Sequence, residues 1–248
     1  MGSITYRKLG YYGRLGNQMF QVASSIGIAS ANKMQYGFPE WANHDAKERF
    51  GSEEDIEVGK WFKPLPSVPE GNYQSLNLPW GYNVVKLDKS RSYDIEGHMQ
   101  SERYFTQCSG LIKELFTLEG QPTEQVAVHI RMGDYCHSND YHPVCDYAYY
   151  QAAIDFIGRD REYIVFSDEP DKAAKMFPDW EIDRSDTKEA LRRMMWCKDF
   201  VIANSTFSWW GSWLGWSKDK KIVAPKRWFG GLAGIDAKDI YTQNMTVI

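Results

Sequence analysis

The second half of the chain alternates short apolar runs with segments of helical periodicity. Strand-like apolar runs occupy residues 126–131, 163–166, 200–203 and 221–224. Apolar residues recur at helical spacing over residues 147–158, 169–177, 187–197 and 207–216. This alternation is typical of α/β folds, because a helix carries the chain back before the next parallel strand begins. We therefore predict a parallel sheet with right-handed crossovers.

The first half has a weaker version of the same pattern. We expect a strand at residues 3–7 and, after a glycine-punctuated loop, an apolar helix over about residues 18–31. Asn17 stands where a side chain commonly caps a helix start, so it is the expected cap. Residues 36–80 are rich in Pro, Gly, Trp and charge, and predict only short elements and loops.

A further strand is expected at residues 92–97 and a helix over residues 101–117. The segment Glu119–Thr123 contains Gly and Pro, which break both periodicities and mark a linker. The predicted organisation is therefore two domains, an N-terminal one at residues 1–120 and a C-terminal one at residues 121–248.

Composition narrows the class of protein. With a net charge of −4 over 248 residues, the chain lacks the basic balance that binding to nucleic acid or an anionic membrane asks for. No apolar run approaches the roughly 18 residues that span a bilayer, and the N-terminus has no apolar signal-peptide core. We expect a cytoplasmic protein without a transmembrane segment, and a place near the inner membrane face stays open. Its four cysteines form no CxxC pair and are expected to be free thiols.

Ligands of open parallel sheets bind at the carboxyl ends of strands, so the residues after each predicted strand are candidates for a site. At the end of the first C-terminal run, His129 and Arg131 share one face because strand side chains alternate. Gly133 allows a tight turn, and Asp134 follows. The planar guanidinium of Arg131 fits phosphate oxygens and keeps its charge. A structural alternative is an Arg131–Asp134 pair that holds the loop.

The second run ends in Ser167 and Asp168. A carboxylate at this point can accept two hydrogen bonds from the adjacent N–H groups of guanine, a donor pair that adenine and uracil lack. The same donor–acceptor logic separates the bases of DNA. The alternative is that Asp168 caps the helix that follows.

The third run leads into Asn204, Ser205 and Thr206, just before a predicted helix. Hydroxyl groups and free backbone N–H groups at a helix start form an anion site, which a pyrophosphate fits. The alternative is ordinary capping by Ser205 or Thr206. The tryptophans on one face of this helix are expected to be core residues: Trp209, Trp213 and Trp216.

The loop from Gly10 to Gly16, followed by Asn17 and Gln18, resembles a phosphate-cradling turn but matches neither GxGxxG nor a Walker A motif. The sequence contains no D-x-D pair, which many sugar-nucleotide enzymes use to hold a divalent cation. One cluster has four residues of zinc-ligating type at a spacing that matches no standard zinc site: Cys136, His137, His142 and Cys145.

Five motifs occur in order along most of the chain: GRLGNQMFQ (13–21), EGHMQSERYF (96–105), HIRMGDY (129–135), FSDE (166–169) and NSTFSWWGSWLG (204–215). Together they resemble the motifs of the α-1,2-fucosyltransferases, glycosyltransferase family 11. The resemblance implies an α/β, GT-B-like fold of two facing Rossmann-like domains with parallel sheets. It implies inverting transfer of L-fucose from GDP-β-L-fucose to a saccharide acceptor, at the 2-hydroxyl of a galactoside. It also implies that the enzyme uses no metal ion and no other cofactor.

By the same resemblance, His129 contacts guanine, Arg131 binds the β-phosphate and Asp168 holds guanine. Arg131 and Asp134 are the candidate catalytic residues, and Asp134 is either a general base or a residue that orients Arg131. The other candidate donor-binding residues are Ser167, Asn204, Ser205 and Thr206 in the C-terminal domain, and Gly16, Asn17 and Gln18 in the N-terminal, acceptor-side domain.

Two other functions stay open. One is a related transferase that uses another GDP-sugar or makes another linkage. The other is a non-catalytic carbohydrate-binding module that uses the Trp faces, although this leaves the polar residues at the three strand ends unexplained. The chain departs from the family at His98 and Met99, where Tyr or Phe is common, and it is short between the first two motifs. These departures leave the identity of the acceptor open.

Overall fold

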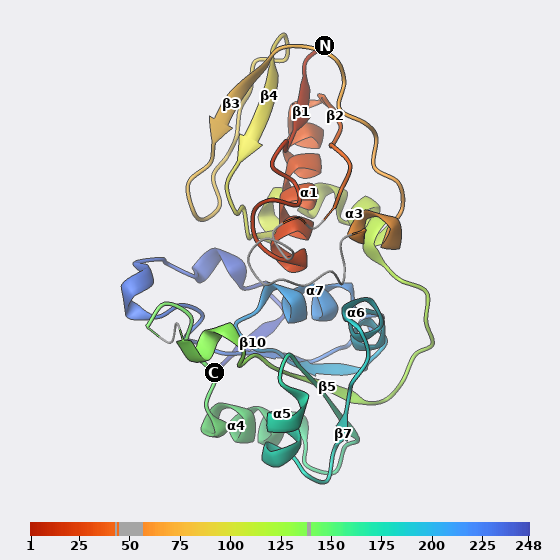
Figure 1. Ribbon diagram of the computed structural model, residues 1–248, viewed down its shortest axis with the longest axis vertical. Coiled ribbons are helices and arrows are strands. Elements are labelled where there is room, and N and C mark those ends of the chain that lie inside the picture. The colour runs from red at the N-terminus through yellow and green to blue at the C-terminus, as the bar shows by residue number, and fades with distance from the viewer. Residues whose placement is uncertain (43, 45–56, 138–139) are drawn as a thin grey trace. The chain divides into compact units, whose positions relative to one another are not determined.

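The chain forms two compact units (Figure 1). The computed structural model describes residues 1–42, 44, 57–137 and 140–248. The first unit contains Met1–Thr117 together with Lys238–Thr242, and the second contains Leu118–Ala237 together with Gln243–Ile248. A short segment near the C-terminus therefore returns to the unit that the start of the chain builds.

The first unit is built on a four-stranded parallel sheet with the strand order β2-β1-β4-β3. Its strands are β1 (Ser3–Thr5), β2 (Gln35–Tyr36), β3 (Tyr73–Asn77) and β4 (Ser92–Glu96). Its helices are α1 (Leu15–Asn32), α3 (Ser109–Phe116) and 3-10 turns at Val58–Trp61, Glu102–Tyr104 and Thr106–Cys108. The strands predicted near residues 3–7 and 92–97 are confirmed, with shorter bounds.

Helix α1 carries no charged side chain and is buried on almost all sides. The predicted cap by Asn17 is wrong, because the helix begins at Leu15 after Arg14, whose side chain makes no capping hydrogen bond. Asn17 already lies in the first turn, and its Oδ1 accepts a hydrogen bond from Gln100 Nε2 at 2.8 Å. The Asn17 side chain therefore makes a tertiary hydrogen bond instead of the helix cap that the local sequence predicts.

Residues 101–117 are helical only in part, because two 3-10 turns precede α3. The reason is their close approach to α1. Gln107 Nε2 donates to the carbonyl oxygen of Gly27 at 2.7 Å. A Cβ atom on Gly27 would stand 2.0 Å from the carbonyl oxygen of Tyr104, so only glycine permits this backbone contact.

The second unit is a six-stranded parallel sheet with the order β10-β9-β8-β5-β6-β7. Its strands are β5 (Val126–Ile130), β6 (Tyr163–Ser167), β7 (Glu181–Ile182), β8 (Asp199–Val201), β9 (Ile222–Ala224) and β10 (Met245–Val247). Its helices are α4 (Tyr147–Ile157), α5 (Pro170–Met176), α6 (Thr187–Met195) and α7 (Thr206–Leu214). All four strands and all four helices predicted in this half are confirmed.

Helices cover both faces of this sheet, with α4 and α5 on one side and α6 and α7 on the other (Figure 1). On the first side, Val126, Val128 and Ile130 of β5 pack with Tyr150 and Ile154 of α4 in a buried cluster. Since strand side chains alternate, Ala127 and His129 face the other side. Two parallel sheets, the second sandwiched between helices, match the expected GT-B-like α/β class.

Segment Lys238–Thr242 is held in the first unit by Asp239. One carboxylate oxygen accepts the backbone N–H of Tyr82 at 2.9 Å, and the other pairs with the Arg103 guanidinium at 3.0 Å. The Arg103 guanidinium also lies 4.1 Å from the centre of the Tyr82 ring. Of the helices in the described ranges, none has both the length and the apolarity needed to cross a bilayer.

The close approach at Gly27 gives a test of the packing in the first unit. We expect Gly27→Ala to lower the free energy of unfolding by about 1–3 kcal/mol, because the new methyl group must push the Tyr104 backbone away from α1. Gly110→Ala in α3 is the matched control, since a Cβ atom there meets nothing within 4 Å. We expect it to shift stability by less than about 1 kcal/mol, towards greater stability. Urea unfolding of both variants measures the difference, and equal midpoints would contradict the packing.

Candidate active site

The strand order of the second unit reverses beside β5. From β5 the sheet grows through β6 to β7 in one direction, and β8 then returns to the other side of β5 before β9 and β10 follow. Loops that leave the carboxyl ends of β5 and β8 therefore diverge, and open α/β sheets bind their ligands in the crevice that results. The candidate residues His129, Arg131 and Ser205 belong to these two strand ends.

His129 lies at this reversal point and is only 5% exposed. Its ring lies 5.7 Å from the ring of Phe207 in α7, which links the two strand ends. Burial, and to a smaller extent the charge of Arg131, lowers the pKa of His129 to about 3, so the imidazole is neutral near pH 7. Its Nδ1 atom is buried and has no hydrogen-bond partner among the described residues. A buried polar atom without a partner costs about 1–3 kcal/mol, a cost that a ligand with a complementary group removes.

Arg131 follows β5 and is held by two carboxylates. Its guanidinium pairs with Asp134 at 2.5 Å and with Asp168 at 2.9 Å. It also lies 5.3 Å from the centre of the Tyr135 ring. The loop-holding Arg131–Asp134 pair, weighed above as an alternative, is therefore present. One guanidinium and two carboxylates sum to one negative charge, so this group of three side chains has no spare positive charge for an anionic ligand.

Asp168 does not cap the helix after β6, so that alternative is wrong. The N-cap position of α5 belongs to Glu169, and the neighbouring Ser167 hydroxyl accepts the Glu169 N–H at 3.0 Å. Asp168 turns back to β5, where its Oδ1 accepts the backbone N–H of Met132 at 2.9 Å. A Cβ atom on Gly133 would lie 2.4 Å from Asp168 Oδ2, so glycine is needed there to admit the carboxylate.

The start of α7 supplies the third strand-end group. Ser205 occupies the N-cap position but its side chain makes no capping hydrogen bond, and Thr206 is the first helical residue. The capping alternative is therefore wrong for both. The Ser205 side chain is left at the amino end of a nine-residue helix, where backbone N–H groups and the helix dipole favour an anion.

Asn204 fixes the loops around this helix start. Its Nδ2 donates to the carbonyl oxygens of Pro143 (2.9 Å) and Trp228 (3.0 Å), and its Oδ1 accepts from Cys145 Sγ at 3.6 Å. Its own carbonyl oxygen accepts the Tyr135 hydroxyl at 3.2 Å. With these partners the Asn204 amide holds three loops in place, which is a positioning role at the edge of the site.

The tryptophans of α7 are core residues, as expected. Trp209 and Trp210 are fully buried, and Trp213 is 9% exposed. The rings of Trp209 and Trp213 stack at 6.0 Å. Trp216 lies beyond the end of the helix at Leu214, so it does not continue the stripe.

Gly16, Asn17 and Gln18 belong to the first unit. Gln18 is fully buried: its Nε2 donates to the Gly13 carbonyl at 2.6 Å, and its Oε1 accepts the Trp41 indole N–H at 2.7 Å. Gln21, one turn later, donates to the Tyr12 carbonyl at 2.7 Å. Gln18 and Gln21 thus stabilise the conformation of the glycine loop through hydrogen bonds to its carbonyl oxygens. The motif pattern did not predict these contacts.

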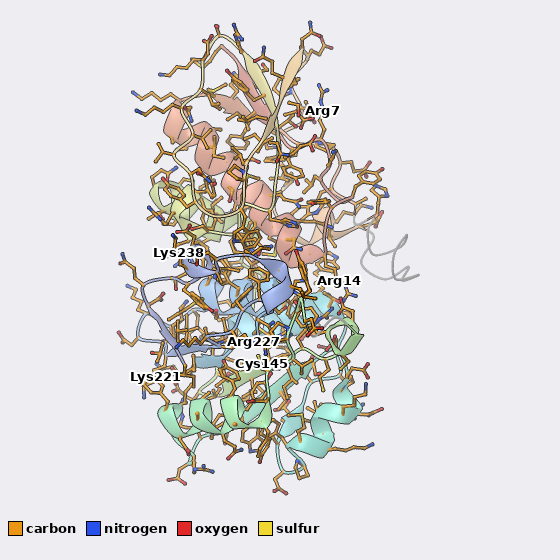
Figure 2. The ribbon with its side chains drawn as sticks, turned by 90° about the vertical axis from the view of Figure 1, so that its left-hand side faces the viewer. Arg7, Arg14, Cys145, Lys221, Arg227 and Lys238 are labelled. Atoms are coloured by element: carbon orange, nitrogen blue, oxygen red, sulfur yellow. The ribbon has the colours of Figure 1, made fainter. Side chains whose placement is uncertain are left out.

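A fourth strand end in the second unit carries cations that the motif pattern did not single out. β9 ends at Ala224, and Lys226 and Arg227 come after it. Trp228 is buried and anchored through Asn204, whereas Arg227 is exposed and has no ion pair or hydrogen bond with any described residue. Figure 2 labels Arg227 and also Lys221, which precedes the same strand at its opposite end. The strand-end rule identifies Arg227 once it is applied to the fourth strand as well as to the first three.

The zinc-type cluster does not gather as a metal site in the described part of the chain. No group of three or more His, Cys, Asp or Glu residues is placed there to hold a metal ion. His142 stacks on Tyr135 at 4.8 Å instead. The side chain of His137 lies outside the described residues. All four cysteines are free thiols, as predicted.

The sequence profile of glycosyl transferase family 11 matches residues 71–244. The match starts in the first unit just before β3 and runs through almost all of the second unit. It includes every strand-end residue of the second unit described above. The glycine loop and Gln18 of the first unit lie outside it.

Two curated proteins of Escherichia coli are similar to this chain. The O-antigen biosynthesis glycosyltransferase WbnK is 36% identical over 118 residues, which cover 42% of this chain and 39% of that protein. An alpha-1,2-colitosyltransferase is 31% identical over 173 residues, which cover 58% of this chain and 59% of that protein. The chain thus spans less than two thirds of the length of the curated relatives it matches.

The buried neutral imidazole of His129 predicts a specific pH dependence of stability. The unfolded chain takes up a proton on this group below about pH 6.5, but the folded chain does not until about pH 3. Stability contributed by the neutral form is therefore lost as the pH falls from about 6.5 towards 3, at up to about 1.4 kcal/mol per pH unit. In His129→Leu we expect this part of the slope to disappear.

Urea unfolding of the parent protein and of His129→Leu at several pH values between 4.5 and 7 measures the difference, and the pairwise comparison cancels the other histidines. An identical pH dependence in the two proteins would mean that His129 is not held neutral by burial.

Proposed function

The chain belongs to glycosyl transferase family 11, and from this premise we propose that it is an inverting, GDP-fucose-dependent fucosyltransferase. It transfers L-fucose from GDP-β-L-fucose to a sugar hydroxyl, the 2-hydroxyl of a galactoside. The observation that carries the proposal is the site at the reversal beside β5. There the unpartnered Nδ1 of His129, the guanidinium of Arg131 and the start of α7 stand at neighbouring strand ends.

The guanine base is the proposed ligand of His129 and Asp168. Asp168 already pairs with Arg131 and accepts the Met132 N–H. A carboxylate offers about four acceptor positions, so two remain for the adjacent N–H donors of guanine. His129 Nδ1 is the buried polar atom at this point that lacks a partner, and base recognition would satisfy it.

In the proposed reaction the acceptor oxygen attacks the anomeric carbon of fucose from the face opposite to GDP. The bond between that carbon and the β-phosphate oxygen breaks, and its electron pair leaves with GDP, so the configuration inverts. Positive charge develops on the sugar and negative charge on the β-phosphate. Preorganised donors aimed at such developing charge commonly contribute more to catalysis than any other effect, and Arg131 and the start of α7 fill this role without a metal ion.

Charge balance indicates that Arg131 does not act alone. Because two carboxylates already neutralise its guanidinium and add one negative charge, a diphosphate needs a further cation. Arg227 is exposed at the carboxyl edge of the same sheet, one residue from the Trp228 carbonyl that Asn204 binds. We assign Arg227 as the second cation that binds the diphosphate.

Asp134 has two candidate roles, general base and positioning residue. Its carboxylate is bonded to Arg131 in the present structure, which supports the positioning role. A loose transition state with a strongly cationic sugar requires little help from a base. The acceptor proton then leaves to solvent after most of the bond cleavage.

A second candidate donor is favoured by one relative. An alpha-1,2-colitosyltransferase is 31% identical to this chain over 173 residues. As a sugar, colitose is fucose without one ring hydroxyl. A site that hydrogen-bonds this hydroxyl would reject the deoxy sugar strongly, whereas an apolar site would discriminate weakly. Mass spectrometry of products formed from GDP-fucose, GDP-colitose and other GDP-sugars decides between the donors.

The central test of the proposal is the role of Arg131. We expect Arg131→Ala to lower the rate of fucosyl transfer by at least about 10²–10³-fold, the usual cost of losing one preorganised charge-stabilising group. Circular dichroism checks that the fold survives, and calorimetry with GDP measures donor binding. Arg159→Ala is the matched control, because Arg159 is exposed just after α4 and forms a surface ion pair with Asp155.

Both assays are run with and without EDTA. Transfer is expected to persist in the presence of the chelator. A near-native rate for Arg131→Ala, or a loss of turnover with EDTA, would contradict the proposed mechanism. A parent protein that fails to bind GDP would instead support a non-catalytic carbohydrate-binding module.

The assignment of Arg227 has its own test. We expect Arg227→Ala to weaken GDP binding about tenfold or more, and Arg227→Lys to retain part of the affinity, because lysine keeps the charge without the planar fork. Lys221→Ala removes an exposed cation from the opposite end of β9 and serves as the control. Affinities that fall equally in Arg227→Ala and Lys221→Ala would indicate a general charge effect and contradict the assignment.

A further inference from the structure

Three neighbouring strands of the first unit are each followed by an aromatic ring at the carboxyl edge of the sheet. The strand order places β1 beside β4 and β4 beside β3. Tyr12 lies in the loop after β1, His98 follows β4 and Trp80 follows β3. The second unit places charged groups at the corresponding edge of its own sheet, so the two edges differ in chemistry.

The three rings contact one another in the order of their strands. The ring centres of Tyr12 and His98 are 4.8 Å apart with the planes inclined by 30°. Those of His98 and Trp80 are 5.9 Å apart, inclined by 58°. Tyr12 is 41% exposed, and His98 and Trp80 are half-buried. We call Tyr12, His98 and Trp80 the aromatic shelf.

The backbone at Met99, the residue after His98 of the aromatic shelf, has a strained conformation. Met99 has φ of +47°, a left-handed conformation that side chains other than glycine rarely adopt. Its carbonyl accepts the Ser24 hydroxyl at 2.9 Å, and the Gly97 carbonyl accepts the Tyr6 hydroxyl at 3.2 Å. Such strain persists only where the surroundings fix it, and it concentrates at functional sites.

The Tyr12 end of the shelf is fixed as well. Gln21, buried in α1, donates to the Tyr12 carbonyl at 2.7 Å. Gln100, next to Met99, donates to Asn17 of α1 at 2.8 Å. The segments that carry Tyr12 and His98 are therefore tied to the same helix, so these two parts of the shelf are held in place before any ligand arrives. Preorganisation of this kind lowers the entropy cost of binding.

The exposure of these rings separates them from the core aromatics. Trp209 and Trp210 of the second unit are fully buried and contact each other at 5.0 Å between ring centres. The shelf offers the faces of three mutually tilted rings at the edge of the sheet. Lys8, which comes after β1, forms an ion pair near this edge with Glu96, the last residue of β4. Aromatic ring faces with charged hydrogen-bonding groups nearby match a pyranose ring, which has a C–H face and a polar circumference.

We propose that the aromatic shelf is the binding site for the acceptor, and that it takes the apolar C–H face of a hexopyranose. The inference rests on the proposed function in one respect, that the acceptor of this transferase is a sugar. It adds the residues that bind the acceptor. It also gives a role to His98 and Met99, where the chain departs from the sequence pattern of the α-1,2-fucosyltransferases.

The kinetic test separates acceptor binding from donor binding. We expect Tyr12→Ala, Trp80→Ala and His98→Ala each to raise the KM for a β-galactoside acceptor about tenfold or more, with the KM for GDP-fucose and the affinity for GDP unchanged. His98→Phe should restore most of the acceptor KM because it restores an aromatic ring. Recovery by Phe distinguishes stacking from proton transfer, which Phe cannot perform.

Tyr11→Ala is the matched control. Tyr11 lies in the same loop and is 52% exposed, but its ring stacks on His44 at 4.2 Å instead of on the shelf. We expect this variant to keep the acceptor KM of the parent. An unchanged acceptor KM in Tyr12→Ala and His98→Ala, with folded protein and normal GDP binding, would overturn the proposal.

A direct binding measurement keeps the shelf testable apart from the transfer reaction. Saturation-transfer NMR with methyl β-D-galactopyranoside is expected to give a signal with the parent protein and with Tyr11→Ala, and to lose it with Tyr12→Ala and Trp80→Ala. Galactoside binding without GDP binding would contradict the proposed function but support the shelf. GDP binding with a galactoside signal that survives in both shelf variants would contradict the shelf alone.

Discussion

The reversal of strand order beside β5 is the constraint on which the candidate active site depends. A sheet that grows in both directions from one strand must send the loops of β5 and β8 apart, and open α/β sheets bind their ligands in the space between such loops. The candidate catalytic and donor-binding groups of the second unit stand around this point. Gly133 admits the Asp168 carboxylate, and Asn204 binds the surrounding loops, so these two residues help to fix the geometry of the strand ends.

The second half of the fold could be predicted from the sequence because its central strands are continuous apolar runs between clear helical segments. Buried parallel strands leave this signal since both of their faces are covered. The edge strand β7 spans only two residues, too few for any period to register. In the first half, the prediction that Asn17 caps a helix failed for a different reason. Asn17 has the residue type of a cap, but the contact with Gln100 decides its role, and that contact joins residues far apart in sequence.

The residues of the candidate site could be identified from the sequence, but most of their contacts could not. The position of Arg131 and Asp168 after strands identified both residues but not their ion pair, because the pair depends on the register that sets Ile130 beside Ser167. The buried amides of Gln18 and Gln21 have the sequence appearance of ligands or surface groups. Their partners are loop carbonyls, which carry no sequence signal. The sequence did not suggest the role that we propose for Arg227, because a Pro-Lys-Arg run after a strand has the appearance of an ordinary surface loop.

The return of segment Lys238–Thr242 to the first unit sets the order in which the protein can be completed during synthesis. Asp239 joins Tyr82 and Arg103 of the first unit, yet it leaves the ribosome after nearly all of the second unit has been made. The strand β10 of the second unit emerges later still. The first unit therefore stays incomplete until residues 238–242 have been made, and a nascent chain cut short within residues 238–248 lacks a piece of one unit or of both.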